Sequence, residues 1–273
     1  MTSARGASKN RFWTEPDARI GAQGRGERSR RWTCDPRGTR QTVVVRTYGQ
    51  YCPIARAAEI LAERWTPVIV RNLLLGCTTF SEIARGAPGI SRTLLAQRLR
   101  DLERAGIVQR TPHSNRGGFR YLLTDAGKDL SDVVDAMGVW GARWLEVVPT
   151  HLDPGVALWS MCNAVRVDRL PHRRVVVRLE FRDQPRRHRL FWLVLADGAG
   201  EVCVKHPGFE EDLWIEADSE AFVKWHMGRM PWSRAIDEGR IVVHGPRTLA
   251  RAFPTWNGRS KFASVRPRFP VEA

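Results

Sequence analysis

Residues 89–110 read GISRTLLAQRLRDLERAGIVQR, and this stretch decides the fold of the first half of the chain. On a helical wheel most of its apolar side chains fall on one half, which predicts an amphipathic helix whose apolar half is in the core. These side chains are Ile90, Leu94, Leu95, Leu99, Leu102 and Ala105. The outward half holds Arg92, Thr93, Ala96, Gln97, Arg100 and Arg104, without an acid in its first turns. Because a solvated helix face usually mixes charge signs, this composition favours contact with a polyanion.

The segments on either side give this helix its context. A short helix is expected over residues 80–85, followed by a turn that contains Gly86, Pro88 and Gly89. After the quoted stretch, strands are expected over residues 107–111 and 119–123, joined through a Gly-Gly turn. The order of short helix, glycine turn, basic helix and hairpin is that of a helix-turn-helix with a wing.

The outward side chains of the helix can be assigned to different contacts with DNA. Arg92, Thr93 and Gln97 are best placed for base edges, since Arg can bridge guanine O6 and N7 and Gln can bridge adenine N6 and N7. Ser91 is in the N-cap position, where free backbone amides favour an anion. We expect Ser91 and Arg100 to hold phosphates.

Two further groups of basic residues have different expected roles. Arg98 lies within the apolar arc of the wheel, so we expect a structural role and an acidic partner on a neighbouring helix. In the hairpin, Arg116 and Arg120 are candidates for contact with the DNA backbone or the minor groove. A basic hairpin alone is usually a solvated turn, and its position behind a helix-turn-helix is what favours DNA contact.

Helical patterns flank this motif on both sides. Pro53 suits the first turn of a helix, and Pro67 is expected to start another that buries Ile69 and Leu73 and ends at Gly76. Thr124 is expected to cap one long helix that reaches residue 146.

Three stretches of this region together resemble the HxlR-type winged helix-turn-helix regulators of bacteria. They are YGQYCPIARAAEILAERWTPVIVRNLLLG, TFSEIARGAPGISRTLLAQRLRDLERAGIV and YLLTDAGKDL, within residues 48–146. The resemblance implies a homodimer joined through the N-terminal helix and the long helix after the wing. Each reading helix would then occupy one half-site of an inverted repeat on double-stranded DNA, with a spacing of roughly 34 to 36 Å.

The same resemblance implies a redox role for one cysteine. Some members of the family respond to electrophiles or oxidants through a cysteine near the start of the domain, and Cys52 matches it in the context YCP. A thiol beside a helix N-terminus has its thiolate favoured. The alternative is that Cys52 simply packs.

Composition agrees with a nucleic-acid partner without requiring one. The 273 residues carry a formal net charge of +15, which favours a polyanion, although a general preference for arginine would also produce it. No stretch has the length of a transmembrane or signal segment, so we expect a cytoplasmic protein without a membrane partner. The five cysteines lack a C-x-x-C pair, which argues against a disulfide framework and a zinc site. We expect no metal and no cofactor.

The sequence divides into three zones. Residues 1–42 are rich in Gly, Arg and Ser and are expected to be disordered, either as a basic arm or as a solvated leader. Residues 43–148 form the winged helix-turn-helix domain. Residues 153–269 predict an α+β domain with a mostly antiparallel sheet, with strands near VVVRLEFRD, RLFWLVLAD, EVCVKH, DLWIEAD and IVVH. Pro149 and Pro154 mark the junction.

The third zone resembles sterol-carrier-protein-2-like domains over about its last hundred residues, in the run DLWIEADSEAFVKWHMGRMPWSRAIDEGRIVVHGPRTLARAFPTW. The resemblance implies a tunnel for an apolar small molecule. Its candidate lining residues are Phe222, Trp225, Met227, Met230 and Trp232. Most Trp and Met at such spacing simply pack in a core.

These observations predict a DNA-binding transcriptional regulator, a repressor whose C-terminal domain senses an apolar effector. Alternatives are a carrier of lipid or sterol-like ligands, or an enzyme acting in the C-terminal cavity. Catalytic motifs such as G-x-S-x-G and H-E-x-x-H are missing from the sequence, so we expect no enzymatic activity.

Overall fold

The computed structural model describes residues 47–113, 117–257 and 259–268. The chain forms two compact units, Met1–Gln50 and Tyr51–Ala273. Of the first unit, only residues 47–50 are described, and there Gly49 donates its backbone N–H to Thr47 Oγ1 at 3.1 Å. The leader expected over residues 1–42 therefore lies outside the described residues, and all helices and strands below belong to the second unit.

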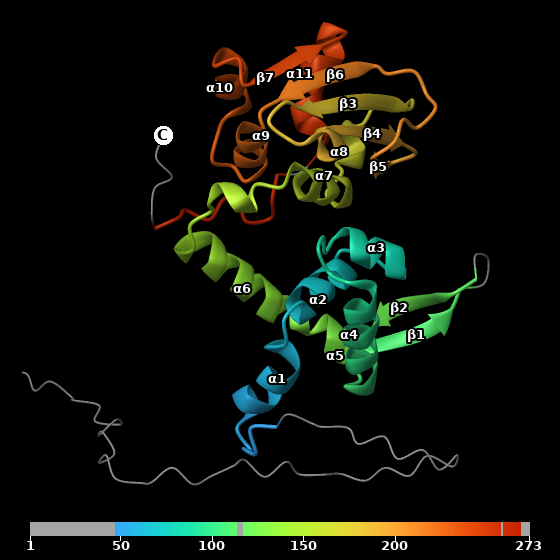
Figure 1. Ribbon diagram of the computed structural model, residues 1–273, viewed down its shortest axis with the longest axis vertical. Helices are drawn as coiled ribbons and strands as arrows, with labels where there is room; N and C mark the ends of the chain where they lie inside the picture. The colour runs from blue at the N-terminus through green and yellow to red at the C-terminus, as the bar shows by residue number, and fades with distance from the viewer. Residues whose placement is uncertain (1–46, 114–116, 258, 269–273) are drawn as a thin grey trace, which may run out of the picture. The chain divides into compact units, whose positions relative to one another are not determined.

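The first part of the second unit contains helices and one two-stranded hairpin (Figure 1). In chain order they are α1 (Pro53–Leu61), α2 (Thr66–Leu74), α3 (Phe80–Arg85), α4 (Arg92–Arg104), β1 (Val108–Pro112), β2 (Phe119–Leu123), α5 (Asp125–Lys128) and α6 (Leu130–Trp144). Pro53 and Pro67 lie in the first turns of α1 and α2, as predicted. The expected helices, turn and hairpin occur in the expected order.

One predicted helix is wrong in its extent. The helix expected from Thr124 to residue 146 is two helices, because a turn at Asp129 separates α5 from α6. Thr124 caps α5 and donates its hydroxyl to Gly106 O at 2.7 Å. A Cβ on Gly127 would lie 2.3 Å from Ile107 O, so α5 is held tightly against the start of the hairpin. α6 begins only after this anchored turn.

The remaining elements build an α+β part. They are η1 (Pro149–His151), α7 (Pro154–Asn163), η2 (Val167–Arg169), β3 (Val175–Phe181), α8 (Arg186–Arg189), β4 (Leu190–Ala196), β5 (Ala199–Cys203), β6 (Leu213–Ala217), α9 (Ser219–His226), α10 (Trp232–Asp237), β7 (Ile241–His244) and α11 (Arg247–Trp256). The strand order is β5-β4-β3-β6-β7. Only the central β3–β6 pair is parallel among these strands, so the sheet is mostly antiparallel, as predicted.

Three details of this part correct the sequence expectations. β5 starts at Ala199 and ends at Cys203, because Asp197 and Gly198 have positive φ and form a tight turn directly after β4. The sequence from Arg247 predicts a last helix that ends near Phe253, whereas α11 continues to Trp256. Pro154, taken as a junction residue, opens α7 behind the N-cap Asp153.

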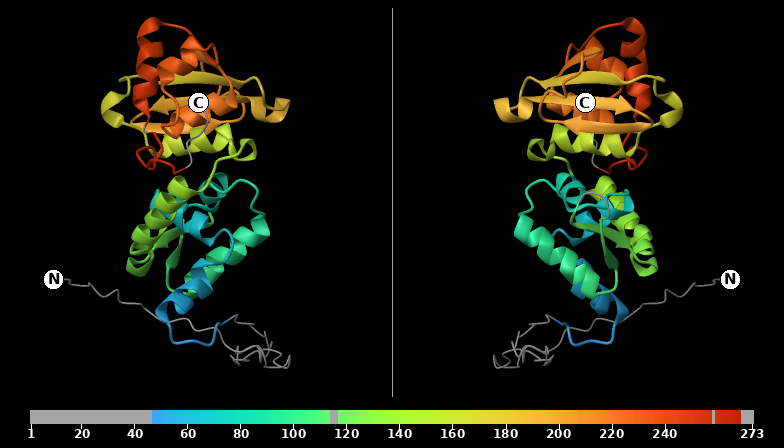
Figure 2. Two further views of the ribbon diagram at one scale, coloured as in Figure 1. Left: turned by 90° about the vertical axis from the view of Figure 1, so that its left-hand side faces the viewer. Right: turned by 90° about the vertical axis from the view of Figure 1, so that its right-hand side faces the viewer.

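The core of this part lies on one face of the sheet. On β3 the residues Val175, Val177, Leu179 and Phe181 are fully buried, and they pack in one cluster with residues of α7, α9, α10 and α11. Figure 2 shows the strands and these helices from two opposite sides. The alternate residues of β3 include Arg178 and Glu180, which form an ion pair at 3.1 Å.

A second cluster forms the core around the helix-turn-helix. It holds Leu95, Leu99 and Leu102 of α4, each at most 1% exposed, with Ile69 and Ile83 of the preceding helices. Trp159 of α7 packs against this second cluster, and the Arg71 guanidinium lies 5.2 Å from the centre of its ring. Burial of the three leucines fixes which face of α4 remains exposed.

Candidate nucleic-acid interface

The N-terminus of α4 has the predicted cap. Ser91 Oγ accepts the backbone N–H of Leu94 at 3.2 Å, and the first turn contains no acid. Gly89, at φ 89°, provides the turn that leads into this cap. The remaining free amides of the first turn, together with the helix dipole, favour an anion at this end of α4.

The candidate base-reading residues follow directly after the cap. Arg92 and Thr93 are exposed, and Gln97 is half-buried one turn further along α4. The Arg92 guanidinium lies 5.2 Å from the ring centre of Phe80, the first residue of α3. This cation–π contact gives Arg92 a preferred position across the helix-turn-helix while its side chain remains exposed.

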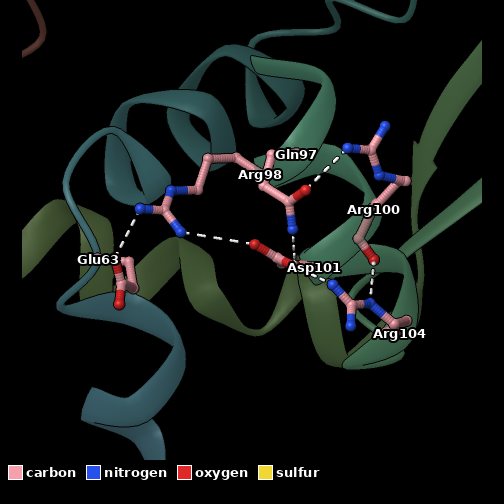
Figure 3. Close-up of polar contacts among 6 residues, drawn as sticks. All are labelled: Glu63, Gln97, Arg98, Arg100, Asp101 and Arg104. Carbon is pink, nitrogen blue, oxygen red and sulfur yellow. Dashed lines mark hydrogen bonds and ion pairs between the residues drawn. The ribbon is translucent and has the colours of Figure 1, made fainter. Parts of the chain in front are cut away.

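Gln97 is held by its neighbours on α4 (Figure 3). Its Nε2 donates to Asp101 Oδ1 at 2.9 Å, and its Oε1 accepts from Arg100 Nη2 at 2.8 Å. Arg104 pairs with the same Asp101 oxygen. The amide of Gln97 therefore has a defined orientation, with one N–H and one lone pair left for another partner.

Arg98 has the acidic partner predicted for it. Its Nη2 donates to Glu63 Oε2 at 2.6 Å, and its Nη1 lies 3.5 Å from Asp101 Oδ2 (Figure 3). Glu63 belongs to the turn between α1 and α2, and the Arg98 side chain is 18% exposed. The structural role of Arg98 is confirmed, although the partner lies in a turn next to a helix.

The hairpin is fixed to the segment that precedes α3. Tyr121 donates its backbone N–H to Thr78 O at 2.7 Å, and Arg120 forms a β-bridge with Thr79.

Thr79 also caps α3, in a capping box with Glu82. Burial opposes ionisation of Glu82, but backbone hydrogen bonds from Thr79 and Thr78 outweigh it and lower the pKa of Glu82. The carboxylate state is the one that secures this cap.

Of the two candidate DNA contacts of the hairpin, one lies in the described part of the chain. Arg120 is exposed on β2, whereas Arg116 lies outside the described residues. Sequence reasoning did not assign Arg110 of β1, whose guanidinium lies 4.1 Å from the ring centre of the exposed Phe119. Arg110 pairs with Tyr121, so Phe119 is its diagonal neighbour on β2, and a long side chain can reach an aromatic ring at that position.

The candidate ligand residues of the C-terminal part pack mainly with one another. Phe222, Trp225 and Met230 are buried, and the rings of Trp225 and Trp232 lie 4.6 Å apart. Met227 differs, since it lines a cavity of about 390 Å³.

Cys52 occupies the N-cap position of α1 and is half-buried. The other thiols of the described part are less ionisable than an ordinary cysteine. Burial raises the pKa of Cys162 to about 12, and burial also raises the pKa of Cys77.

Within residues 47–113, 117–257 and 259–268, no group of three or more His, Cys, Asp or Glu side chains is arranged to hold a metal. In the same part of the chain, no helix has the length and apolar character needed to cross a membrane.

Comparison with known proteins points to one family. The model of the HxlR-like helix-turn-helix family matches residues 60–149. An uncharacterized HTH-type transcriptional regulator of Bacillus subtilis, YvaP, is 36% identical over 110 residues, which are 38% of this chain and 96% of that protein. The regulator Rv3095 of Mycobacterium tuberculosis is 38% identical over 93 residues, 34% of this chain, and the match spans 58% of its length.

Among solved structures, the reduced form of the transcriptional regulator YodB from B. subtilis is 33% identical. The match covers 36% of this chain and 97% of that chain, with a TM-score of 0.32. Residues 150–273 lie outside the match to the family model.

Proposed function

The chain belongs to the HxlR-like helix-turn-helix family, and from this membership we propose that it is a dimeric, sequence-specific DNA-binding regulator of transcription. The observation that carries the proposal is the surface of α4. Behind a capped N-terminus it presents Arg92, Thr93 and Arg100 to solvent, and its first turn has no acid.

Each side chain of this surface has a distinct proposed contact. Arg92, Thr93 and Gln97 read base edges in the major groove, and Ser91 and Arg100 hold phosphates. Arg116 and Arg120 contact the backbone or minor groove from the hairpin. Each phosphate contact removed should lower the slope of log K against log salt by about 0.9.

Dimerisation is proposed through α1 and α6. The exposed side chains of α6 include Val133, Met137, Trp140 and Trp144, which recur at helical spacing along one stripe. On α1, Ile54 is 80% exposed, and none of the residues of this helix is buried. An isologous dimer would cover such surfaces and set two copies of α4 on an inverted repeat, with half-sites roughly 34 to 36 Å apart.

The decisive experiment begins with selection of genomic DNA fragments by the full-length protein. Fluorescence anisotropy on a selected site then compares the wild type with Arg92→Ala and Gln97→Ala. Each variant should lose about tenfold or more in specific affinity and relax selectivity at one base pair, since a bidentate contact is worth about 1–3 kcal/mol. Arg247→Ala on α11 removes an exposed arginine elsewhere and is the matched control. Specific binding that survives both α4 substitutions contradicts the proposal.

Repression is the proposed mode. A dimer that covers its operator competes with RNA polymerase for the same DNA, and it needs no second surface that binds the polymerase. Transcription in vitro from a promoter that contains the selected site should fall as protein is added. A rise would reverse this part of the proposal.

Two regulatory inputs are proposed alongside DNA binding. One is an apolar small molecule sensed by the C-terminal part, near the candidate residues Phe222, Trp225, Met227, Met230 and Trp232. The other is an electrophile or oxidant acting at Cys52, supported by its position at the N-terminus of α1. A quinone should lower operator affinity in the wild type and leave Cys52→Ser unaffected. Equal responses would remove Cys52 from the mechanism.

A further inference from the structure

A cavity of about 390 Å³ lies where α6 meets the C-terminal part of the chain. Gly141, Ala142 and Leu145 form one wall, and Met227 at the end of α9 and Phe262 form another. Val147 also lines it. Its volume is at the lower end of the range of small-molecule sites, and these walls are apolar.

Residues 259–268, which we call the C-terminal segment, attach to α6 beside this cavity. Lys261 Nζ pairs with Asp135 Oδ1 at 2.6 Å, and the Phe262 ring fills the space above Gly138, where a Cβ would lie 2.1 Å from it. The Arg268 guanidinium lies 4.8 Å from the ring centre of Trp144. The helix proposed for dimerisation is thus also the support of the C-terminal segment.

One guanidinium at the cavity has no acidic partner. Arg229 is half-buried and lines the cavity, where its Nη1 donates to Val265 O at 2.7 Å and its Nη2 lies 3.5 Å from Ala142 O. Among the described residues no carboxylate forms an ion pair with Arg229, although Glu146 lines the same cavity. A half-buried cation whose contacts are neutral carbonyls is electrostatically suited to an anion.

We propose that this cavity binds a small apolar molecule that carries one carboxylate. The carboxylate is held by Arg229, and the apolar body packs against Leu145, Val147 and Met227. The inference rests on the proposed function for its consequence: a ligand seated between α6 and the C-terminal segment favours one arrangement of the helix that joins the dimer. The ligand changes DNA binding only if its affinity for the DNA-binding arrangement of the dimer differs from its affinity for the arrangement that does not bind DNA.

The first experiment measures binding directly, by calorimetry on the full-length protein with octanoate and with 1-octanol as the uncharged probe. Octanoate should bind once per chain and at least about tenfold more tightly than octanol, as expected for charge-assisted hydrogen bonds. Arg229→Gln should remove that preference for octanoate, whereas Arg247→Gln should keep it. Equal affinities for the two probes in the wild type overturn the proposal.

A second variant addresses the risk that Arg229→Gln disturbs the C-terminal segment. Gly141 lines the cavity, and a Cβ there would have no neighbour nearer than Leu145 Cδ1 at 3.9 Å, so we expect the side chain of Gly141→Leu to occupy cavity space. This variant should lose binding of both probes while its unfolding transition is kept. Unchanged octanoate binding by Gly141→Leu would place the ligand elsewhere and overturn the assignment.

The consequence for regulation is measured separately. Saturating octanoate should change operator affinity by at least about fivefold, and the operator should change octanoate affinity by the same factor. The double variant Arg92→Ala/Gln97→Ala should still bind octanoate. The octanoate affinity measured by calorimetry would therefore be unchanged even if the DNA-binding proposal failed. Octanoate binding with unchanged operator affinity and an unchanged dimer dissociation constant would overturn the regulatory role.

Discussion

Asp101 is the acid around which the polar side chains of α4 are arranged. It contacts Gln97, Arg98 and Arg104, and through Gln97 it also orders Arg100 (Figure 3). On a helix proposed to face DNA an acid would repel phosphate, so its presence calls for a compensating role. We assign that role to fixing the amide of Gln97, which makes Asp101 a positioning residue.

Asp101→Ala should separate affinity from selectivity. Removing the negative charge should strengthen binding to nonspecific DNA, while a freely rotating Gln97 should lose about 1 kcal/mol of discrimination at the base pair it reads. Anisotropy with the selected site and a site altered at that base pair measures both effects. Glu103→Ala, on the same helix, is the control for the charge alone. A variant with unaltered discrimination would show that Asp101 has no positioning role.

His226 gives the fold a pH dependence. It is 5% exposed, its Nδ1 has no hydrogen-bond partner in the described part of the chain, and burial lowers its pKa to about 4. An unfolded histidine has a pKa of about 6.5, so between these values the unfolded chain binds the additional proton. The contribution of neutral His226 to the free energy of unfolding is therefore fully present above pH 6.5 and decreases as the pH falls towards 4.

The loss should reach up to about 3 kcal/mol near pH 4. Urea unfolding at a series of pH values measures it, and His226→Phe should flatten the dependence in this window. His172→Gln, which removes an exposed histidine, should leave the dependence as in the wild type. Identical slopes for His226→Phe and the wild type would exclude His226 as the cause.

At the scale of elements, three buried leucines decide which face of α4 remains exposed, and that face carries the side chains proposed to contact DNA. Leu95, Leu99 and Leu102 are buried, and this leaves Arg92, Thr93 and Arg100 on the exposed side. The pattern is local, so the periodicity of the sequence predicts it. α7 was missed for the opposite reason: its residues are apolar almost all round, and a helix buried on several sides shows no amphipathic period.

Two glycines test how closely the elements pack. A Cβ on Gly86, which ends α3, would lie 2.4 Å from Trp159 Cζ2 and 2.6 Å from Asn72 Nδ2, whereas a Cβ on Gly141 of α6 meets nothing closer than 3.9 Å. Gly86→Ala should therefore destabilise the fold by about 1–3 kcal/mol through overpacking. Gly141→Ala should stabilise it by about 0.5–1 kcal/mol through helix propensity. Chemical denaturation of the two variants compares them, and shifts of the same sign would contradict this packing.

At the scale of the whole molecule, large apolar side chains remain exposed on α6. Trp140 is 58% exposed and Met137 is 50% exposed. The stripe that they form is unusual for a helix surface facing water and suits a second copy of the chain. In the proposed dimer, recognition of an inverted repeat would depend on this contact, because each α4 helix would read only one half-site.

Trp140→Glu should convert the dimer to a monomer at micromolar concentration, measured by sedimentation velocity. Affinity for the full inverted repeat should fall by about tenfold or more, because the two half-sites are no longer bound as one unit. Val167→Glu places the same charge on another exposed apolar residue, on η2, and should leave the dimer intact. A Trp140→Glu protein that remains dimeric would exclude α6 from the interface.

The sequence by itself determined the elements around the helix-turn-helix, because their signals are local. Ser91 and Thr79 are caps within one turn of the residues that they bind, and the Gly117-Gly118 pair falls between the two strands of the hairpin. Only the tertiary structure decided which distant groups meet. Glu63 is the partner of Arg98, β3 pairs in parallel with β6, and Phe262 fills the space over Gly138 of α6. These pairings join residues far apart in the chain, and their choice depends on how the buried faces of the elements fit together, which a one-dimensional pattern does not contain.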